Sequence, residues 1–219
     1  MPSSMNSTKL SVAPVREQQL LVKHLGRVGY EPTWRAMQAF TRGRAAATAD
    51  ELWLLQHPPV YTLGLAARTA HLPRNRHDIP VVRIDRGGQI TYHGPGQVIA
   101  YLLLDMKRRD LTVRRLVRLM ESAVLDLLAD YGIGAGNRVE APGVYVGAAK
   151  VAAVGLRVTR GCCYHGLALN VDMDLSPFAA IDPCGYPGLA VTQLKDLGVS
   201  ESAQQVSHEL ARHLERLLA

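Results

Sequence analysis

The stretch Gly143-Val-Tyr-Val-Gly-Ala-Ala-Lys-Val-Ala-Ala-Val-Gly-Leu-Arg-Val158 carries the pattern on which the fold depends. Its valines fall on both sides of Gly147-Ala148, which predicts two β-strands joined by a tight turn. Lys150 opens the second strand between apolar neighbours. A lysine in such a place either extends its ammonium to water or points it into a pocket. The stretch therefore predicts a strand pair within a sheet and marks Lys150 as a candidate for chemistry.

Cys184 stands further along the chain, among prolines and glycines, in the run Pro183-Cys-Gly-Tyr-Pro-Gly188. That composition predicts a tight loop and excludes a regular helix or strand. A thiol near a buried ammonium is favoured as thiolate, so Lys150 and Cys184 together suggest an activated nucleophile. The competing interpretation is an ordinary surface lysine and a small buried cysteine, which single residues of these types usually are.

The remaining chain alternates strands and helices irregularly, which predicts an α+β fold with a mixed, mainly antiparallel β-sheet covered by helices. The clearest helix follows Thr112, a good N-cap, and ends before Gly132, with apolar residues at helical spacing between them. The predicted helices are 32–40, 112–131 and 201–218, and the predicted strands are 20–25, 51–56, 60–64, 81–84, 98–104, 144–146, 151–158 and 167–171.

Length and composition predict one catalytic domain over residues 20–219 and a polar, disordered tail over residues 1–19. No apolar run is long enough to span a bilayer, and the first residues lack the apolar segment of a secretory signal. The three cysteines form neither a disulfide framework nor a zinc-ligand spacing. We therefore expect a cytoplasmic protein that needs no metal or other cofactor and binds no membrane.

The chain is basic, with a formal net charge of +6, which raises the question of an acidic partner. Aromatic residues make up only 5% and are not interleaved with basic runs, so nucleic acid is not expected. Arginines gather at Arg108, Arg109, Arg114, Arg115 and Arg118. This cluster is either the solvated face of a helix or a docking patch for an acidic protein.

The run from Arg86 to Gln97 is rich in glycine, which allows a backbone to approach a ligand closely. A hairpin turn at Gly87-Gly88 followed by a loop explains the same glycines. The small residues Gly155, Gly166 and Ala168 leave room either for an alkyl chain or for close packing of strands. These alternatives stay open on the residues alone.

Four ordered motifs together resemble the lipoyl(octanoyl) transferases. The motifs are Arg86-Gly-Gly-Gln-Ile-Thr-Tyr-His-Gly-Pro-Gly-Gln97, Gly147-Ala-Ala-Lys-Val-Ala-Ala-Val-Gly-Leu-Arg157, Cys163-Tyr-His-Gly-Leu-Ala-Leu-Asn-Val-Asp172 and Pro183-Cys-Gly-Tyr-Pro-Gly188. The resemblance extends from about Leu20 to the end of the chain. It implies the fold of the catalytic domains of biotin- and lipoate-protein ligases. It also implies transfer of an octanoyl or lipoyl group, without a cofactor, in protein lipoylation.

The same resemblance implies the partners and the roles of individual residues. The donor is octanoyl-acyl carrier protein, and the acceptors are lysines of the lipoyl domains of 2-oxoacid dehydrogenases and of the glycine cleavage H protein. Cys184 is the acyl-thioester nucleophile, and Lys150 lowers its pKa and transfers protons. The substrate-binding residues are Arg86, Gly87, Gly88, Gln89, Ile90, Thr91, Tyr92, His93, Ala153, Val154, Gly155, Gly166, Leu167 and Ala168.

Three other functions fit parts of the pattern. An ATP-dependent lipoate or biotin ligase has use for Lys150 but none for a thiol at Cys184. A cysteine hydrolase needs a base, for which His93 and His165 are candidates. A non-catalytic module that binds a carrier protein needs only the arginine cluster.

Overall fold

The computed structural model describes residues 20–67, 72–74, 78–182 and 188–219. A seven-stranded sheet with the strand order β1-β2-β6-β10-β9-β8-β7 forms its centre, and a three-stranded sheet β4-β3-β5 flanks it. The strands are β1 (Leu20–Arg27), β2 (Asp50–Gln56), β3 (Val60–Leu63), β4 (Val81–Arg83), β5 (Ile90–His93), β6 (Gln97–Asp105), β7 (Gly136–Asn137), β8 (Gly143–Val146), β9 (Ala149–Thr159) and β10 (Cys162–Asn170). The α-helices are α1 (Tyr30–Arg42), α2 (Val113–Asp130) and α3 (Ala203–Leu218).

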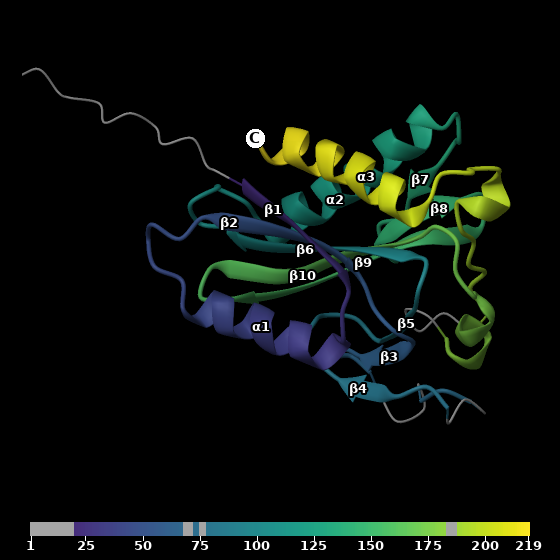
Figure 1. Cartoon of the computed structure of the whole chain (residues 1–219), viewed down its shortest axis with the longest axis horizontal. Helices are drawn as coiled ribbons and strands as arrows, with labels where there is room; N and C mark the ends of the chain where they lie inside the picture. Colours follow the sequence, from purple (N-terminus) through teal and green to yellow (C-terminus); the bar gives the residue numbers. More distant parts are fainter. Residues whose placement is uncertain (1–19, 68–71, 75–77, 183–187) are drawn as a thin grey trace, which may run out of the picture.

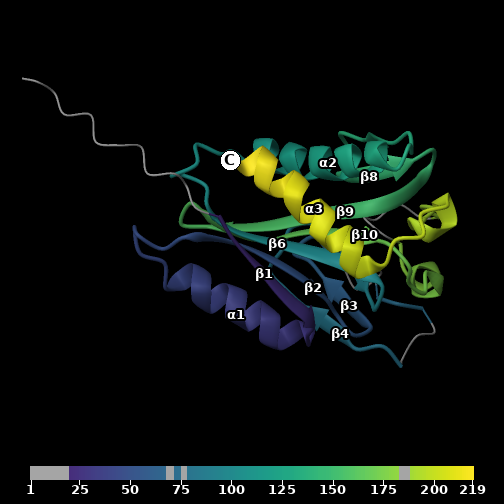
Figure 2. The ribbon, with the colours of Figure 1, turned by 45° about the horizontal axis from the view of Figure 1, so that its top comes forward.

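Helices cover both faces of the large sheet, with α2 and α3 on one face and α1 on the other (Figures 1 and 2). The central strand β6 explains this arrangement, because successive side chains of a strand point to opposite faces. Val98, Ala100, Leu102 and Leu104 pack in the core beneath α2 and α3. The alternate residues Ile99, Tyr101 and Leu103 pack in the core that contains Met37 of α1.

The predicted fold class is confirmed, since the large sheet is antiparallel except for the parallel pair β1 and β2. Several details differ from the sequence-based prediction, among them the short strand β7, which was not predicted. The segment predicted as loop after Asp85 contains β5, a four-residue strand that pairs with β3 and follows glycines typical of a loop. Strand β10 begins at Cys162, five residues before its predicted start. No helix among the described residues is long and apolar enough to cross a membrane.

One arginine of the proposed docking patch is buried against a carboxylate and therefore does not belong to the surface. Asp50 is fully buried and accepts hydrogen bonds from Arg44, from Arg108 Nη2 at 2.7 Å and from Arg109 Nε. The side chain of Arg109 is only 3% exposed, so it is a core residue and not part of a surface patch. Arg114, Arg115 and Arg118 on α2 are exposed, and a docking role for them stays a prediction.

We expect Asp50→Ala to lower the free energy of unfolding by about 3–5 kcal/mol, because it leaves buried arginine charges without their carboxylate. Denaturant unfolding of the two proteins measures the difference. The matched control is Glu31→Ala, which breaks the exposed pair between Glu31 and Arg35 on α1. That change is expected to cost about 0.5 kcal/mol or less. Equal losses in the two variants would contradict the structural role of Asp50.

Candidate active site

Lys150 lies at the start of β9 with its side chain turned inward, and the whole residue is only 4% exposed. Its Nζ donates a hydrogen bond to the carbonyl oxygen of Pro142 at 3.0 Å. It also lies 5.1 Å from the centre of the Tyr145 ring, within the range of a cation–π interaction. The sequence left open whether the Lys150 side chain faces water or a pocket. In the structure the side chain points inward.

The segment that follows Cys184 in the sequence is hydrogen-bonded directly to the backbone of Lys150. Lys150 N donates to the carbonyl oxygen of Ala190 at 2.8 Å, and Thr192 N donates to that of Lys150 at 3.0 Å. Val191 thus forms a parallel bridge with Lys150. Cys184 itself lies outside the described residues.

A cavity of about 560 Å³ opens between β9, β10 and the glycine-rich segment before β5. Thirteen of the fourteen residues predicted to bind substrate line it: Arg86, Gly87, Gly88, Gln89, Ile90, Thr91, His93, Ala153, Val154, Gly155, Gly166, Leu167 and Ala168. Its volume is typical of small-molecule sites. A smaller cavity lined by Lys150 shares Thr91 and Ala153 with it, so the two cavities adjoin.

The cavity has an open side and a closed side. Gly87, Gly88, Val113 and Glu140 line it and are exposed, so they mark the entrance. The buried part is lined partly by polar side chains, among them Tyr30, Tyr101 and His165, which are 6%, 4% and 2% exposed. An apolar molecule that enters from the open side therefore meets polar groups at the inner end.

Arg86 fixes the glycine-rich segment against the two sheets. Its Nη2 donates to the carbonyl oxygen of Thr62 at 2.8 Å and to Thr62 Oγ1 at 2.9 Å, and its Nη1 donates to the carbonyl oxygen of Gly87. Gly87 N donates to the carbonyl oxygen of Leu156 on β9. A Cβ on Gly155 would lie 3.3 Å from Arg86 Cδ, so glycine lets the arginine lie flat on the strand. The glycines here serve both close packing and the shape of the cavity.

His93 is held in one orientation by a chain of side chains. Gln97 Nε2 donates to Asn170 Oδ1, so Gln97 Oε1 accepts from His93 Nδ1 at 2.8 Å. Asn170 Nδ2 in turn donates to the carbonyl oxygen of Thr192. Burial lowers the pKa of His93 to about 3, so this imidazole is neutral at physiological pH. The chain connects the cavity wall with the segment bonded to Lys150.

His165 is turned into the cavity by an irregularity of β10. It has a φ of 66°, the left-handed region that residues other than glycine seldom adopt. Its Nε2 donates to Asp85 at 3.4 Å, and Asp85 also accepts from Trp34, Gln38 and Tyr164. Burial raises the pKa of Asp85, but the four hydrogen bonds outweigh it and hold the pKa well below its ordinary value. Burial lowers the pKa of His165, so a neutral imidazole faces a charged carboxylate.

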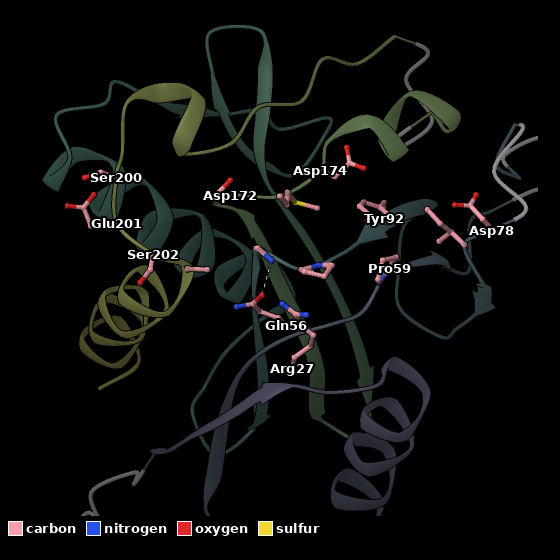
Figure 3. A pocket seen from close by; sticks show the side chains of 15 residues that line it. Arg27, Gln56, Pro59, Asp78, Tyr92, Asp172, Asp174, Ser200, Glu201 and Ser202 are labelled. Carbon is pink, nitrogen blue, oxygen red and sulfur yellow. Dashed lines mark hydrogen bonds between the residues drawn. The ribbon is translucent and has the colours of Figure 1, made fainter.

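Tyr92, the remaining predicted residue, lines a different hollow (Figure 3). This hollow contains Asp172, Asp174 and Glu201, and Gly96 N donates to Gln56 Oε1 within it. Successive residues of β5 point to opposite sides, which separates Tyr92 from Thr91 and His93. A binding role for the fourteen residues as a set stays a prediction.

Several residues that line the large cavity were not predicted from the sequence. They are Tyr30, Ala66, Ile99, Tyr101, Val113, Val117, Glu140, Ala141, Pro142, Leu156 and His165, the last of which was considered only as a candidate base. For Ile99 and Tyr101 the sequence carried a usable signal. They are alternate residues of a strand predicted to be buried, so they point to the same face of the sheet. Tyr30 and Pro142 come from other parts of the chain, and the sequence carried no signal that they line the cavity.

Residues 29–215 match the model of the family described as the lipoyl protein ligase A/B catalytic domain. The octanoyltransferase of Azoarcus sp. is 63% identical to this chain, over 91% of this chain and 88% of its own length. That of Thiobacillus denitrificans is 60% identical over 98% of this chain and 99% of its own length.

Solved structures of low sequence identity share the fold. A bipartite lipoate protein ligase from Thermoplasma acidophilum aligns with a TM-score of 0.74 at 18% identity, over 92% of this chain and 84% of its own. The biotin protein ligase of Aquifex aeolicus, in complex with biotin and ATP, aligns with a TM-score of 0.58 at 13% identity, over 92% and 71% of the two chains.

Proposed function

Because the chain belongs to the family of lipoyl protein ligase A/B catalytic domains, we propose that it moves an octanoyl group onto a lysine of lipoyl domains. The observation that carries this proposal is the identity of 60–63% to octanoyltransferases over at least 91% of the chain. On the same ground the chain is an acyltransferase. The donor, the covalent intermediate and the acceptors are the finer parts of the proposal, and each rests on its own argument.

In the first step the Cys184 thiolate attacks the thioester carbonyl of octanoyl-acyl carrier protein. A new carbon–sulfur bond forms at Cys184, and the bond to the thiol of the carrier breaks. The Lys150 ammonium favours the attacking thiolate and supplies the proton that the departing thiolate of the carrier takes up. One thioester replaces another, so the step needs no ATP.

In the second step the lysine amine of a lipoyl domain attacks the acyl-enzyme. An amide bond forms, and Cys184 leaves as thiolate. The amine attacks in its neutral form, after giving one proton to solvent, and Lys150, neutral after the first step, accepts the second proton as the amide forms. The step from thioester to amide is downhill. It regenerates the ammonium beside the thiolate.

The position of Lys150 supports this assignment. Its ammonium is buried beside Pro142 and Tyr145, and Pro142 also lines a cavity large enough for an acyl chain. Val191, which bridges Lys150, is only seven residues after Cys184. Seven residues extend to at most about 25 Å, so the chain permits contact between the thiol and the ammonium.

The acyl chain packs against four small residues, which are Ala153, Gly155, Gly166 and Ala168. Ala153 pairs with Ala168 and Gly155 with Gly166 across β9 and β10, so the four small residues form one patch on the face of the sheet that carries α1. Burying the chain there contributes about 0.8 kcal/mol for each methylene.

The competing function is an ATP-dependent ligase, since ligases share this fold. Incubation of the protein and a lipoyl domain with either octanoyl-acyl carrier protein or free octanoate plus ATP separates the two. We expect the lipoyl domain to become octanoylated only with the carrier thioester. Intact-mass spectrometry of the domain measures this modification. Modification only with octanoate and ATP would overturn the proposal.

A further inference from the structure

Glu121 of α2 is an acidic residue inside the protein, with only 5% of its surface exposed. Its Oε1 accepts a hydrogen bond from Gly143 N at 2.8 Å, and its Oε2 accepts one from Asn137 Nδ2 at 2.9 Å. Both oxygens act as acceptors, as those of an ionised carboxylate do, and both of these donors are neutral. A buried carboxylate is costly unless positive charge compensates it. The place of Glu121 therefore points to a cation beyond its two hydrogen-bond donors.

One peptide group lies between Glu121 and the ammonium of Lys150. The carbonyl oxygen of Pro142 accepts from Lys150 Nζ at 3.0 Å. The N–H of Gly143, which donates to Glu121, belongs to the same peptide group. This peptide bond is trans, so its oxygen and its hydrogen lie on opposite sides. The ammonium therefore meets the oxygen end of the peptide group, and the carboxylate meets the hydrogen end.

We infer that Glu121 is a positioning residue, which holds the Pro142–Gly143 peptide group and through it fixes the Lys150 ammonium in the orientation that the reaction needs. The two charges act on the peptide group in the same direction, because one attracts its oxygen and the other its N–H. Hydrogen bonds in such a chain polarise and strengthen one another, and bonds to charged groups are the stronger ones. The inference rests on the proposed function in taking Lys150 as the proton donor and acceptor.

The conformation of Gly143 allows the peptide group to lie against the lysine. Its φ is 136°, in a region that residues with a side chain rarely adopt. A Cβ at this position would lie 3.3 Å from Lys150 Nζ and would clash with the carbonyl oxygen of Ala152. Glycine therefore keeps the space beside the ammonium for the backbone, and the backbone connects Lys150 on β9 with Glu121 on α2.

Two substitutions separate the hydrogen bond of Glu121 from its charge. Glu121→Gln keeps an oxygen that accepts from Gly143 N and removes the negative charge. Glu121→Leu removes both the acceptor and the charge, and keeps a side chain of similar size in the core. The matched control is Asn137→Ala, which removes the other hydrogen-bond partner of Glu121 and leaves the Pro142–Gly143 peptide group untouched.

The first measurement is kcat and KM for transfer from octanoyl-acyl carrier protein to a lipoyl domain. We expect Glu121→Leu to lower kcat by about thirtyfold to a hundredfold, because a misplaced proton donor and acceptor loses much of its contribution, and to leave KM within about twofold. Glu121→Gln is expected to lower kcat by only about threefold to tenfold, since its amide oxygen still orients the peptide group. Asn137→Ala is expected to keep the wild-type kcat. Equal losses in Glu121→Leu and Asn137→Ala would overturn the inference.

The same substitution in the Lys150→Ala protein shows whether Glu121 acts through the lysine. There we expect Glu121→Gln to lower kcat no further, because the group that it positions is gone. A further loss as large as in the wild-type background would mean that Glu121 supports activity only by holding the fold. That outcome would overturn the positioning role.

The inference and the proposed function fail in different ways. No transfer by the wild type from the carrier thioester would overturn the function. The thermal unfolding midpoint then still tests the inference, because it requires no turnover. We expect Glu121→Gln to lower the midpoint in the wild-type background and to lower it less in Lys150→Ala, where the carboxylate has lost its cation. Equal shifts in the two backgrounds would overturn the coupling and leave the transferase function intact.

Discussion

Cys184→Ala is expected to lower octanoyl transfer by about a thousandfold or more, because the acyl-enzyme loses its attacking atom. The other two thiols are poor replacements. Cys163 is fully buried, its thiol contacts the carbonyl oxygen of Leu102, and burial raises its pKa to about 12. Burial also raises the pKa of the half-buried Cys162. Neither supplies a thiolate at neutral pH.

Two measurements check this result. Intact-mass spectrometry after mixing with octanoyl-acyl carrier protein reports the acyl-enzyme, and modification of a lipoyl domain reports complete turnover. Cys162→Ala is the matched control and is expected to keep both. An oxygen ester trapped in Cys184→Ser is compatible with the assignment. An octanoyl group mapped to Cys162 or Cys163 in the wild-type protein would refute it.

Lys150→Ala is expected to slow both half-reactions by about a hundredfold to ten-thousandfold, the usual contribution of a positioned proton donor and acceptor. It also removes the positive charge that favours the Cys184 thiolate. The pH midpoint of alkylation of Cys184 by iodoacetamide should therefore move to higher pH. Lys195→Ala is the control, because that lysine forms an exposed ion pair with Asp172.

Lys150→Arg divides the two roles of the ammonium. A guanidinium keeps the positive charge but does not lose a proton in proteins. We therefore expect an alkylation midpoint between those of the wild type and Lys150→Ala. Attack by the acceptor amine, which needs a base, should be slowed nearly as much as in Lys150→Ala. An unchanged midpoint in Lys150→Ala would shift the activating role to another group, with His93 and His165 in the cavity wall as the candidates.

The fold class was available from the sequence because it depends on local patterns. The apolar run of β6, the capped helix after Thr112 and the turn at Gly147-Ala148 each specify an element over a few residues. The motifs, through the resemblance to lipoyl(octanoyl) transferases, also named most of the predicted residues that line the cavity, whereas the small residues Gly155, Gly166 and Ala168 alone did not distinguish a channel from close packing. The strand β5 escaped, because it lies in the glycine-rich run from Arg86 to Gln97, whose composition is typical of loops.

The chemistry of the cavity wall was decided by tertiary structure. Nothing near Arg109 in sequence shows that it is buried, since its carboxylate partner Asp50 lies in a distant strand. Likewise, the direction of His165 depends on a break in the pairing of β10 with β6 and on Asp85 from another segment. Charge and hydrogen-bonding groups are tolerated inside a protein only where partners meet them, and those partners come together only when the chain folds.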